Sequence, residues 1–201
     1  MIRVLIAEDQ AMIRGALAAL LAIEPDIEVV AQVDRGDRAV QEALRVKPDV
    51  ALLDIEMPGQ DGIAAAADIR AQLPECRTLI LTVFGRPGYL RKAVDAGASG
   101  FLLKDAPPDE LAAAIRRTAK GEKVIDSQLA VAALSEGSSP LTPRERDVLA
   151  MSVRGASVEE VARSLRLTNG TVRNHLSIAI QKLNARNRVE AARIAEEKGW
   201  L

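Results

Sequence analysis

The stretch that most constrains the fold is Val50-Ala-Leu-Leu-Asp54, which Pro58-Gly59 follows after three further residues. Four apolar residues run directly into a carboxylate, and the Pro-Gly pair interrupts any regular structure beyond it. A short continuous apolar run bounded by turn residues is typical of a strand buried on both faces of a parallel sheet. Asp54 then lies at the carboxyl end of that strand, where open α/β sheets bind their ligands.

Residues 1–120 alternate between strand patterns and helix patterns. Strands are predicted over 2–7, 27–33, 48–54, 78–83 and 100–103, and helices over 10–22, 36–46, 61–73, 87–96 and 107–120. Successive strand–helix units with right-handed crossovers predict an α/β doubly wound, five-stranded parallel sheet of the flavodoxin-like type, with helices on both faces.

Two more acids, Glu8 and Asp9, follow the apolar strand at 2–7. Because the carboxyl ends of parallel strands meet at one edge of the sheet, these acids should converge with Asp54. Three neighbouring carboxylates repel one another unless a hard cation lies among them, and Mg²⁺ prefers such oxygen ligands. Asp54 is then a candidate nucleophile that attacks phosphorus and forms an aspartyl phosphate. The simpler alternative is that acids cap strands in loops, which explains any one of them more easily than all three.

Thr82 lies at the end of the strand at 78–83, and Lys104 follows the strand at 100–103. Both strand ends should flank Asp54 in a doubly wound sheet. A lysine ammonium and a threonine hydroxyl suit the oxygens of a transferred phosphoryl group. Singly, each residue is equally consistent with an ordinary loop position.

After Pro140 the sequence shows only helix patterns. Thr142-Pro143-Arg-Glu145 and Ser157-Val-Glu-Glu160 are capping-box sequences, and Asn187-Arg-Val-Glu190 repeats the arrangement with Asn as the cap. A short helix at 157–164 and a longer one at 169–183 predict a helix-turn-helix within a four-helix domain, residues 141–201. Residues 121–140, with a candidate short helix at 128–134, form the predicted linker between the domains.

Composition and charge limit the functions that the chain can have. Residues 1–135 hold 16 basic and 20 acidic side chains (net −4), and residues 136–201 hold 11 basic and 8 acidic side chains (net +3), which favours a polyanionic partner for the second domain. The single cysteine, Cys76, excludes an intramolecular disulfide, and the single histidine, His175, excludes a histidine-rich metal site. Without a signal-peptide pattern or an apolar run of membrane-spanning length, we expect a cytoplasmic protein that does not insert into membranes.

Together, Glu8-Asp9, Asp54, Met57-Pro58-Gly59, Thr82 and Phe101-Leu-Leu-Lys104 resemble a bacterial response-regulator receiver domain. The resemblance implies that Asp54 accepts a phosphoryl group from a sensor histidine kinase. It also implies that Asp9 and Asp54 hold Mg²⁺ by their side chains, with Glu8 assisting and Glu56 contributing its main-chain carbonyl. Lys104 and Thr82 would contact the phosphoryl group, and Thr82 and Phe101 would be the switch pair. By the same resemblance residues 1–120 are the receiver domain.

The second domain resembles the LuxR/NarL-type DNA-binding domain through Leu141-Thr-Pro-Arg-Glu145, Thr171-Val-Arg-Asn-His175, Lys182-Leu183 and Asn187-Arg188. The long helix has one apolar stripe. Opposite it lie Arg173, Asn174, Ser177 and Gln181, where they could enter a major groove of double-stranded promoter DNA. Arg reads guanine and Asn adenine, whereas cations at the helix end suit phosphates. The predicted DNA-contacting residues are Thr171, Arg173, Asn174, His175, Ser177, Lys182, Arg186 and Arg188.

A narrower resemblance, to the DesR branch of these regulators, rests on Asp54-Ile-Glu-Met-Pro-Gly, Phe84-Gly-Arg-Pro-Gly-Tyr89, Gly170-Thr-Val-Arg-Asn174 and Lys198-Gly-Trp200. It implies a membrane-embedded kinase partner and a lipid desaturase gene as the target. Three alternatives stay open: a LuxR-type factor that works without phosphorylation, a phosphatase that uses Asp54, and RNA binding by the second domain. Against a phosphatase, the sequence has no substrate-binding cap between the strands and no second catalytic acid shortly after Asp54. Against RNA binding, the second domain lacks aromatic residues that could stack on bases.

An excess of apolar residues points to self-association. The helices at 10–22 and 107–120 each carry more small apolar residues than packing on a sheet requires, and exposed apolar patches usually mark interfaces. Receivers of the DesR type are similar in pairing through these two helices, so we expect a two-fold dimer on phosphorylation. An alanine-rich surface without a partner is the alternative. The predicted interface residues are Met12, Ala16, Ala19, Ala112 and Ala113.

Overall fold

A computed structural model describes residues 1–83, 87–125, 130–131 and 139–201 of the 201-residue chain. It divides into two compact units, one around a β-sheet and one made of helices. Most of the expected short helix at 128–134, and part of the Phe84–Tyr89 motif, lie outside the described residues.

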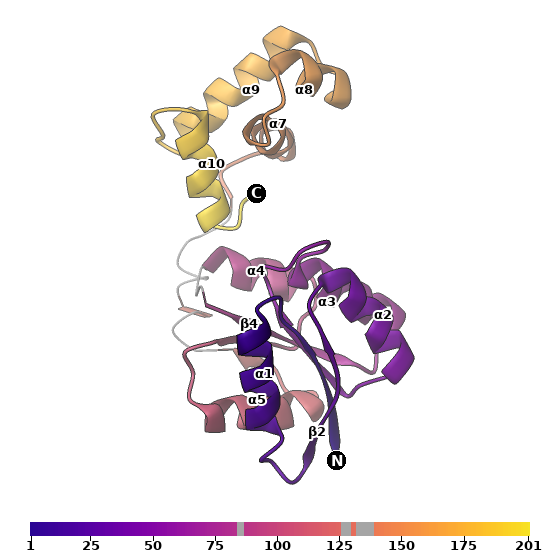
Figure 1. The fold of residues 1–201 in the computed structure, drawn as a ribbon. Helices are drawn as coiled ribbons and strands as arrows, with labels where there is room; N and C mark the ends of the chain where they lie inside the picture. Colours follow the sequence, from indigo (N-terminus) through magenta and orange to yellow (C-terminus); the bar gives the residue numbers. More distant parts are fainter. Residues whose placement is uncertain (84–86, 126–129, 132–138) are drawn as a thin grey trace. The chain divides into compact units, whose positions relative to one another are not determined.

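The first unit alternates strands and helices as the sequence predicts (Figure 1). In chain order the elements are β1 (Ile2–Ala7), α1 (Ala11–Leu21), β2 (Ile27–Val33), α2 (Gly36–Val46), β3 (Val50–Asp54), α3 (Gly62–Gln72), β4 (Arg77–Thr82), α4 (Pro87–Asp95), β5 (Gly100–Leu103), α5 (Pro108–Ala119) and β6 (Val124–Ile125). All the strand pairs are parallel, and the order in the described sheet is β2-β1-β3-β4-β5-β6. This doubly wound α/β architecture confirms the predicted fold class.

A sixth strand, β6, adds to the five strands that the sequence predicts. Val124 and Ile125 pair with Gly100 and Phe101 of β5. The first part of the segment expected to be a linker therefore extends the sheet at its edge. A two-residue strand carries no detectable periodicity, which is why the sequence pattern misses it.

Helices cover both faces of the sheet (Figure 1). On one face, Leu21 of α1 and Leu111, Ala112, Ala114 and Ile115 of α5 pack against inward-facing strand residues that include Val4, Ile6, Leu52 and Leu79. The helices α2 and α3 pack on each other, with α2 against β1 and β2 and α3 against β3 and β4. The central strand β3 is buried along its whole length, as its apolar composition predicts.

An ion-pair cluster ties α5 to the loop between α1 and β2. Arg116 of α5 donates hydrogen bonds to Glu24 at 2.5 Å and to both carboxylate oxygens of Asp26, at 2.5 and 2.8 Å. The hydrogen bonds from Arg116 lower the pKa of Asp26 to about 2. The cluster joins segments about ninety positions apart at the same end of α1 and α5.

The second unit consists, within residues 139–201, of α7 (Pro143–Val153), α8 (Val158–Leu165), α9 (Asn169–Lys182) and α10 (Arg188–Glu197). Capping boxes start α7 at Thr142 and α8 at Ser157, as the sequence predicts. At α10 the prediction is right for Asn187, which accepts from the backbone N–H of Val189 and Glu190, but Glu190 accepts from the N–H of Arg186 instead of completing a box. The apolar sides of all these helices meet in one core that includes Val148, Val172, Leu176 and Trp200.

Candidate functional site

The ends of β1 and β3 bring the predicted acids together. In the parallel register Ala7 pairs with Leu53, so Glu8 and Asp54 follow their strands side by side. One ligand oxygen from each of Glu8, Asp9 and Asp54 lies within 4.8 Å of the other two. Glu8 and Asp54 are buried, whereas Asp9 is exposed. Such a set of oxygen donors, with one side open, is the type that a Mg²⁺ ion binds.

Glycine allows the helix after Asp54 to begin close to the strand end. A Cβ at Gly62 would lie 1.8 Å from the carbonyl oxygen of Asp54, so another residue there would force the chain apart. Asp61 caps α3 by accepting from the N–H of Ala64 at 2.8 Å. The close start of α3 fixes the loop that holds Asp54 and Glu56. Glu56 is exposed in that loop, and its role as a carbonyl ligand stays a prediction.

Lys104 holds two of the buried carboxylates. Its Nζ lies 2.6 Å from Oε2 of Glu8 and 3.0 Å from Oδ2 of Asp54. Burial disfavours its ammonium, but the close ion pairs with Glu8 and Asp54 outweigh burial and raise the pKa of Lys104. For Asp54, burial raises the pKa and Lys104 offsets only part of that effect. The lysine predicted from its place after a strand therefore meets the phosphoacceptor candidate directly.

Thr82 and Phe101 are both buried, on the adjacent strands β4 and β5. The carbonyl of Thr82 accepts from the N–H of Lys104 at 2.8 Å, which links the ends of the two strands. In this structure Phe101 is among the most buried large side chains of the described residues. Their function as a switch pair stays a prediction.

Sequence reasoning missed Arg14, a residue of α1 that contacts the acidic loop. Its Nη1 donates to the main-chain oxygen of Glu8 at 2.6 Å and to that of Asp9 at 3.4 Å. A bond from a side chain to main-chain oxygens depends on no second side chain, so the sequence gives no signal for it. Arg14 fixes the loop that carries the two acids against α1.

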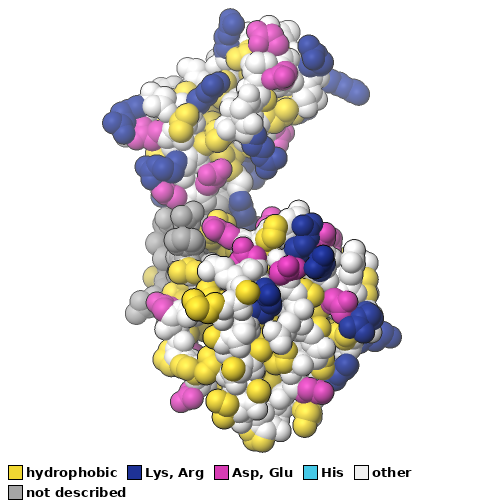
Figure 2. Space-filling model, in the orientation of Figure 1, with side chains coloured by type: hydrophobic (Ala, Val, Ile, Leu, Met, Phe, Trp, Pro, Cys, Tyr) yellow, Lys and Arg dark blue, Asp and Glu magenta, His cyan; other side chains and the backbone are white. Residues whose placement is uncertain are grey.

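On α9, the structure exposes Arg173, Asn174 and Ser177, opposite the buried Val172 and Leu176. Thr171 and His175 are partly buried, while Arg186 and Arg188 beyond the helix are exposed. Figure 2 shows several dark blue Lys and Arg side chains spread over this domain. The predicted groove-facing set therefore shares one exposed side of α9, as the periodicity requires.

Lys182 is placed differently from its prediction. Its Nζ lies 2.8 and 3.0 Å from the two carboxylate oxygens of Glu145, a buried residue of α7. Arg186 also pairs with a carboxylate, that of Glu190, although its own side chain is 87% exposed.

The structure exposes most, but not all, of the residues expected on the association face. Met12 is 85% exposed, and Ala16, Ala19 and Ala113 are also exposed. Ala112 is only 2% exposed because α5 packs on the sheet with a broad side, so its assignment to an open face is wrong. Figure 2 shows hydrophobic side chains gathered over the part of the first unit where α1 lies in Figure 1.

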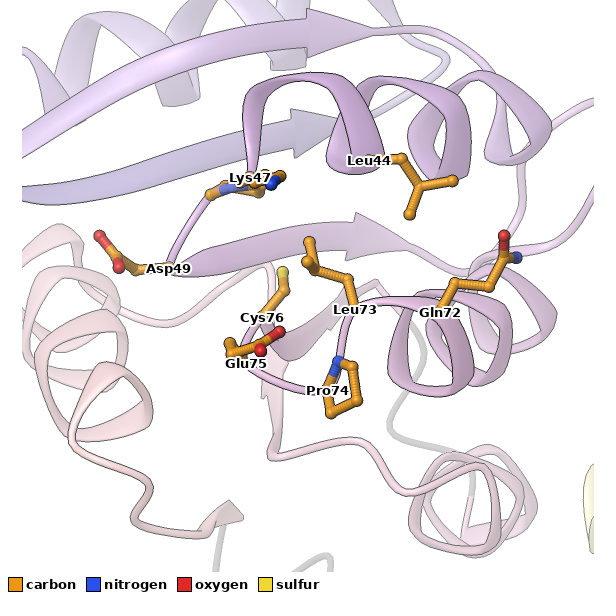
Figure 3. A pocket seen from close by; sticks show the side chains of 9 residues that line it. Leu44, Lys47, Asp49, Gln72, Leu73, Pro74, Glu75 and Cys76 are labelled. Atoms are coloured by element: carbon orange, nitrogen blue, oxygen red, sulfur yellow. The ribbon is translucent and has the colours of Figure 1, made fainter.

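A pocket of about 460 Å³ lies at the opposite, amino ends of the strands, between the ends of α2 and α3 (Figure 3). It includes Lys47, Asp49 and Cys76 but none of the predicted site residues. Burial raises the pKa of the Cys76 thiol to about 12, so a reactive thiolate is not populated at neutral pH. No helix among the described residues is long and apolar enough to cross a bilayer.

Comparisons with known proteins agree with this geometry. The family "Response regulator receiver domain" matches residues 4–116, and "Bacterial regulatory proteins, luxR family" matches residues 139–195. Over the full length of both chains, the sequence is 46% identical to the uncharacterized transcriptional regulatory protein YvfU and 44% identical to the transcriptional regulatory protein DesR, both of Bacillus subtilis. The crystal structure of the response regulator ChrA of a heme-sensing two-component system is 32% identical, with a TM-score of 0.60, and the match covers 100% of this chain and 98% of ChrA.

These similarities establish the family and leave the branch open, because YvfU and DesR match almost equally well. The receiver match covers the acidic cluster, and the luxR match covers α7, α8 and α9. The chain belongs to the LuxR-type response regulators: it is a transcription factor with a receiver domain and a helix-turn-helix DNA-binding domain, and not an enzyme.

Proposed function

We propose that a sensor histidine kinase phosphorylates this regulator on Asp54, and that the phosphorylated protein dimerises and binds promoter DNA to regulate transcription. The observation that carries the proposal is the convergence of Glu8, Asp9 and Asp54 within 4.8 Å, with Lys104 paired to two of them. Acids that only capped the strand ends would not need a buried lysine between them.

The donor set fits Mg²⁺, since hard cations of this size take carboxylate oxygens and keep room for phosphate oxygens. Asp9 and Asp54 would hold the ion by their side chains, Glu8 would assist, and the main-chain carbonyl of Glu56 would complete the protein ligands. When bound, the ion would neutralise charge that develops on the phosphoryl group.

In the transfer, a carboxylate oxygen of Asp54 forms a bond to phosphorus while the bond from phosphorus to the kinase's histidine nitrogen breaks. The imidazole leaves with the electron pair of that bond and takes up a proton. Lys104 pairs with a phosphoryl oxygen instead of Asp54, and the hydroxyl of Thr82 donates to another. Movement of Thr82 toward the phosphoryl group would vacate space into which Phe101 turns.

For DNA recognition, the exposed side of α9 enters the major groove. Arg173 and Asn174 are the proposed base contacts, with Ser177 on the same exposed side and Thr171, in the first turn of α9, as a further proposed contact. His175, Arg186 and Arg188 are proposed to contact the phosphate backbone. The exposure of Arg173, Asn174 and Ser177 opposite the buried stripe supports this orientation.

For dimerisation, the exposed apolar side chains of α1 and the exposed Ala113 of α5 are the proposed interface. A two-fold dimer through these helices would present two recognition helices to a two-fold-symmetric site. The resemblance to the DesR branch implies a membrane-embedded kinase and a lipid desaturase gene, and we propose these as the partner and target; the chain is 44% identical to DesR. Selection of bound genomic fragments by the phosphorylated protein tests that target.

The direct test uses acetyl phosphate and Mg²⁺ as the phosphodonor system. The parent protein should incorporate one phosphoryl group, and Asp54→Ala should incorporate none, as read by intact-protein mass spectrometry. Asp9→Ala should need roughly tenfold more Mg²⁺ for the same rate, because it removes a ligand. Asp109→Ala, an exposed acid of α5, is the control and should behave as the parent.

Stoichiometric labelling of Asp54→Ala would place the acceptor elsewhere. The same preparations distinguish the factor that works without phosphorylation: it would bind its selected DNA equally well before and after treatment with acetyl phosphate.

A further inference from the structure

The ion pair between Glu145 and Lys182 joins the start of α7 to the last residue of the recognition helix α9. Glu145 has a side chain only 5% exposed, and it accepts from the N–H of Thr142 at 2.8 Å as part of the capping box of α7. The capping hydrogen bond alone therefore holds the carboxylate of Glu145 in place, without a contribution from Lys182. Both of its oxygens then lie within 3.0 Å of the ammonium of Lys182, 37 residues away.

The geometry makes Lys182 poorly available to a DNA phosphate. To reach one it would have to leave a buried carboxylate, and an unpaired buried charge is strongly unfavourable. The side chain of Lys182 is 34% exposed, so it is also partly enclosed by the domain. The side chain of Arg186 is 87% exposed although it pairs with the partly buried Glu190, and Arg188 is exposed.

The apolar contacts of α9 do not by themselves fix the orientation of the helix, so a directional contact can add to them. Val172, Leu176 and Ala179 pack in the domain core, and such contacts are non-directional. Lys182 lies nine residues beyond Arg173, a distance of about 14 Å along a helix at 1.5 Å per residue. A rotation of roughly 10° about the Lys182 end would therefore move Arg173 by about 2 Å, enough to break a hydrogen bond to a base.

We propose that Lys182 is a positioning residue that fixes the recognition helix through Glu145, and is not a ligand of the DNA phosphates. The proposal rests on the proposed readout of bases by α9. Its effect should appear in sequence discrimination, because a displaced helix loses base contacts while the phosphate contacts of other residues persist.

The two roles predict opposite results for Glu145→Gln. This variant removes a negative charge and releases Lys182. If Lys182 is a phosphate ligand, the variant should bind every duplex more tightly and with a steeper salt dependence. If Lys182 positions the helix, the variant should lose discrimination by roughly tenfold, the scale of one disturbed base contact, with an unchanged salt slope.

Two duplexes serve as probes: one selected from a random library by the parent protein treated with acetyl phosphate, and one of the same composition in shuffled order. Binding is measured by fluorescence anisotropy over a series of salt concentrations. The control is Glu160→Gln, which removes the same charge from the equivalent position of the α8 capping box, where Glu160 is exposed and pairs with Ser157. It should keep the discrimination of the parent.

Lys182→Arg retains the cation and should keep most of the discrimination. Emission from Trp200, the single tryptophan and a member of this domain's core, checks that each variant is folded. If a single variant unfolds, Glu145→Gln/Lys182→Gln replaces both charges and leaves neither buried without a partner. Loss of discrimination by this double variant supports the proposal, and parental discrimination overturns it.

The proposal is also overturned if Glu145→Gln binds both duplexes more tightly with its discrimination intact. Failure of the parent to prefer the selected duplex would be a different result, since it would contradict base readout by this domain altogether.

Discussion

Nζ of Lys104 lies 3.0 Å from Oδ2 of Asp54, and these side chains are only 8% and 6% exposed. The lysine is the counter-ion that the structure provides for Asp54, and it serves Glu8 at 2.6 Å in the same way. Two strand ends, those of β3 and β5, are therefore held together by charge as well as by the sheet.

Replacement of this counter-ion should destabilise the receiver domain. Lys104→Met leaves Glu8 and Asp54 buried without a cation, and loss of one partner of a buried ion pair costs about 3–5 kcal/mol. Calorimetric unfolding of the full chain should show the receiver transition at lower temperature. Added Mg²⁺ should restore part of the loss, because it supplies the missing positive charge to the folded state. Lys120→Met, an exposed lysine beyond α5, is the control; an equal effect in both variants would contradict the assignment.

Ala16→Arg tests the association face. Ala16 is exposed on α1, so an arginine there is tolerated in the monomer but places two like charges against each other in a two-fold dimer. Analytical ultracentrifugation after treatment with acetyl phosphate should show a dimer for the parent and a monomer for the variant. Ala71→Arg, the same change at an exposed position of α3, should dimerise normally. Dimerisation of Ala16→Arg at the parental affinity would locate the interface elsewhere, most simply on α4 and β5.

Arg173→Ala tests base readout. Removal of a base-contacting arginine should cost roughly 1–3 kcal/mol on the selected duplex and little on a shuffled one. Anisotropy titrations of both duplexes give the two values. Arg193→Ala, an exposed arginine of α10 that pairs with Glu197, is the matched control and should bind as the parent does. Equal loss on both duplexes would make Arg173 a phosphate contact.

The stability of the DNA-binding domain should fall in acid through Glu145. Burial disfavours its carboxylate, but the hydrogen bonds from Lys182 and Thr142 outweigh burial and lower the pKa of Glu145 below its usual 4.5. A lowered pKa in the folded state means that this stabilisation is complete above pH 4.5 and is lost as the pH falls through the folded-state value. Urea unfolding followed by Trp200 emission should show this decline in the parent and a smaller one in Glu145→Gln. Glu159→Gln, at an exposed position of α8, should follow the parent.

Much of the fold and the acidic site could be predicted because each depends on local chemistry. Asp54, Glu8 and Lys104 follow apolar runs, and the geometry of parallel strands brings such residues to one edge. Thr142 and Ser157 start helices through bonds within three residues of themselves.

The errors and omissions concern residues whose environment depends on distant parts of the chain. Ala112 is buried because of how α5 lies on the sheet, and alanine gives too weak a hydrophobic signal to reveal this. The contacts of Arg14 with main-chain oxygens and of Lys182 with Glu145 follow no sequence spacing.

Arg116 and its two carboxylates have a consequence for association. The side chains of Arg116, Glu24 and Asp26 are 27–47% exposed, so solvent screens the ion pairs and they contribute little to the stability of the monomer. They do restrict the loop after α1, however, and hold it to the end of α5. A surface whose segments are already ordered loses less conformational entropy when it meets a partner. If the protein pairs through α1 and α5 as proposed, the cluster would lower the entropic cost of that pairing without touching the partner.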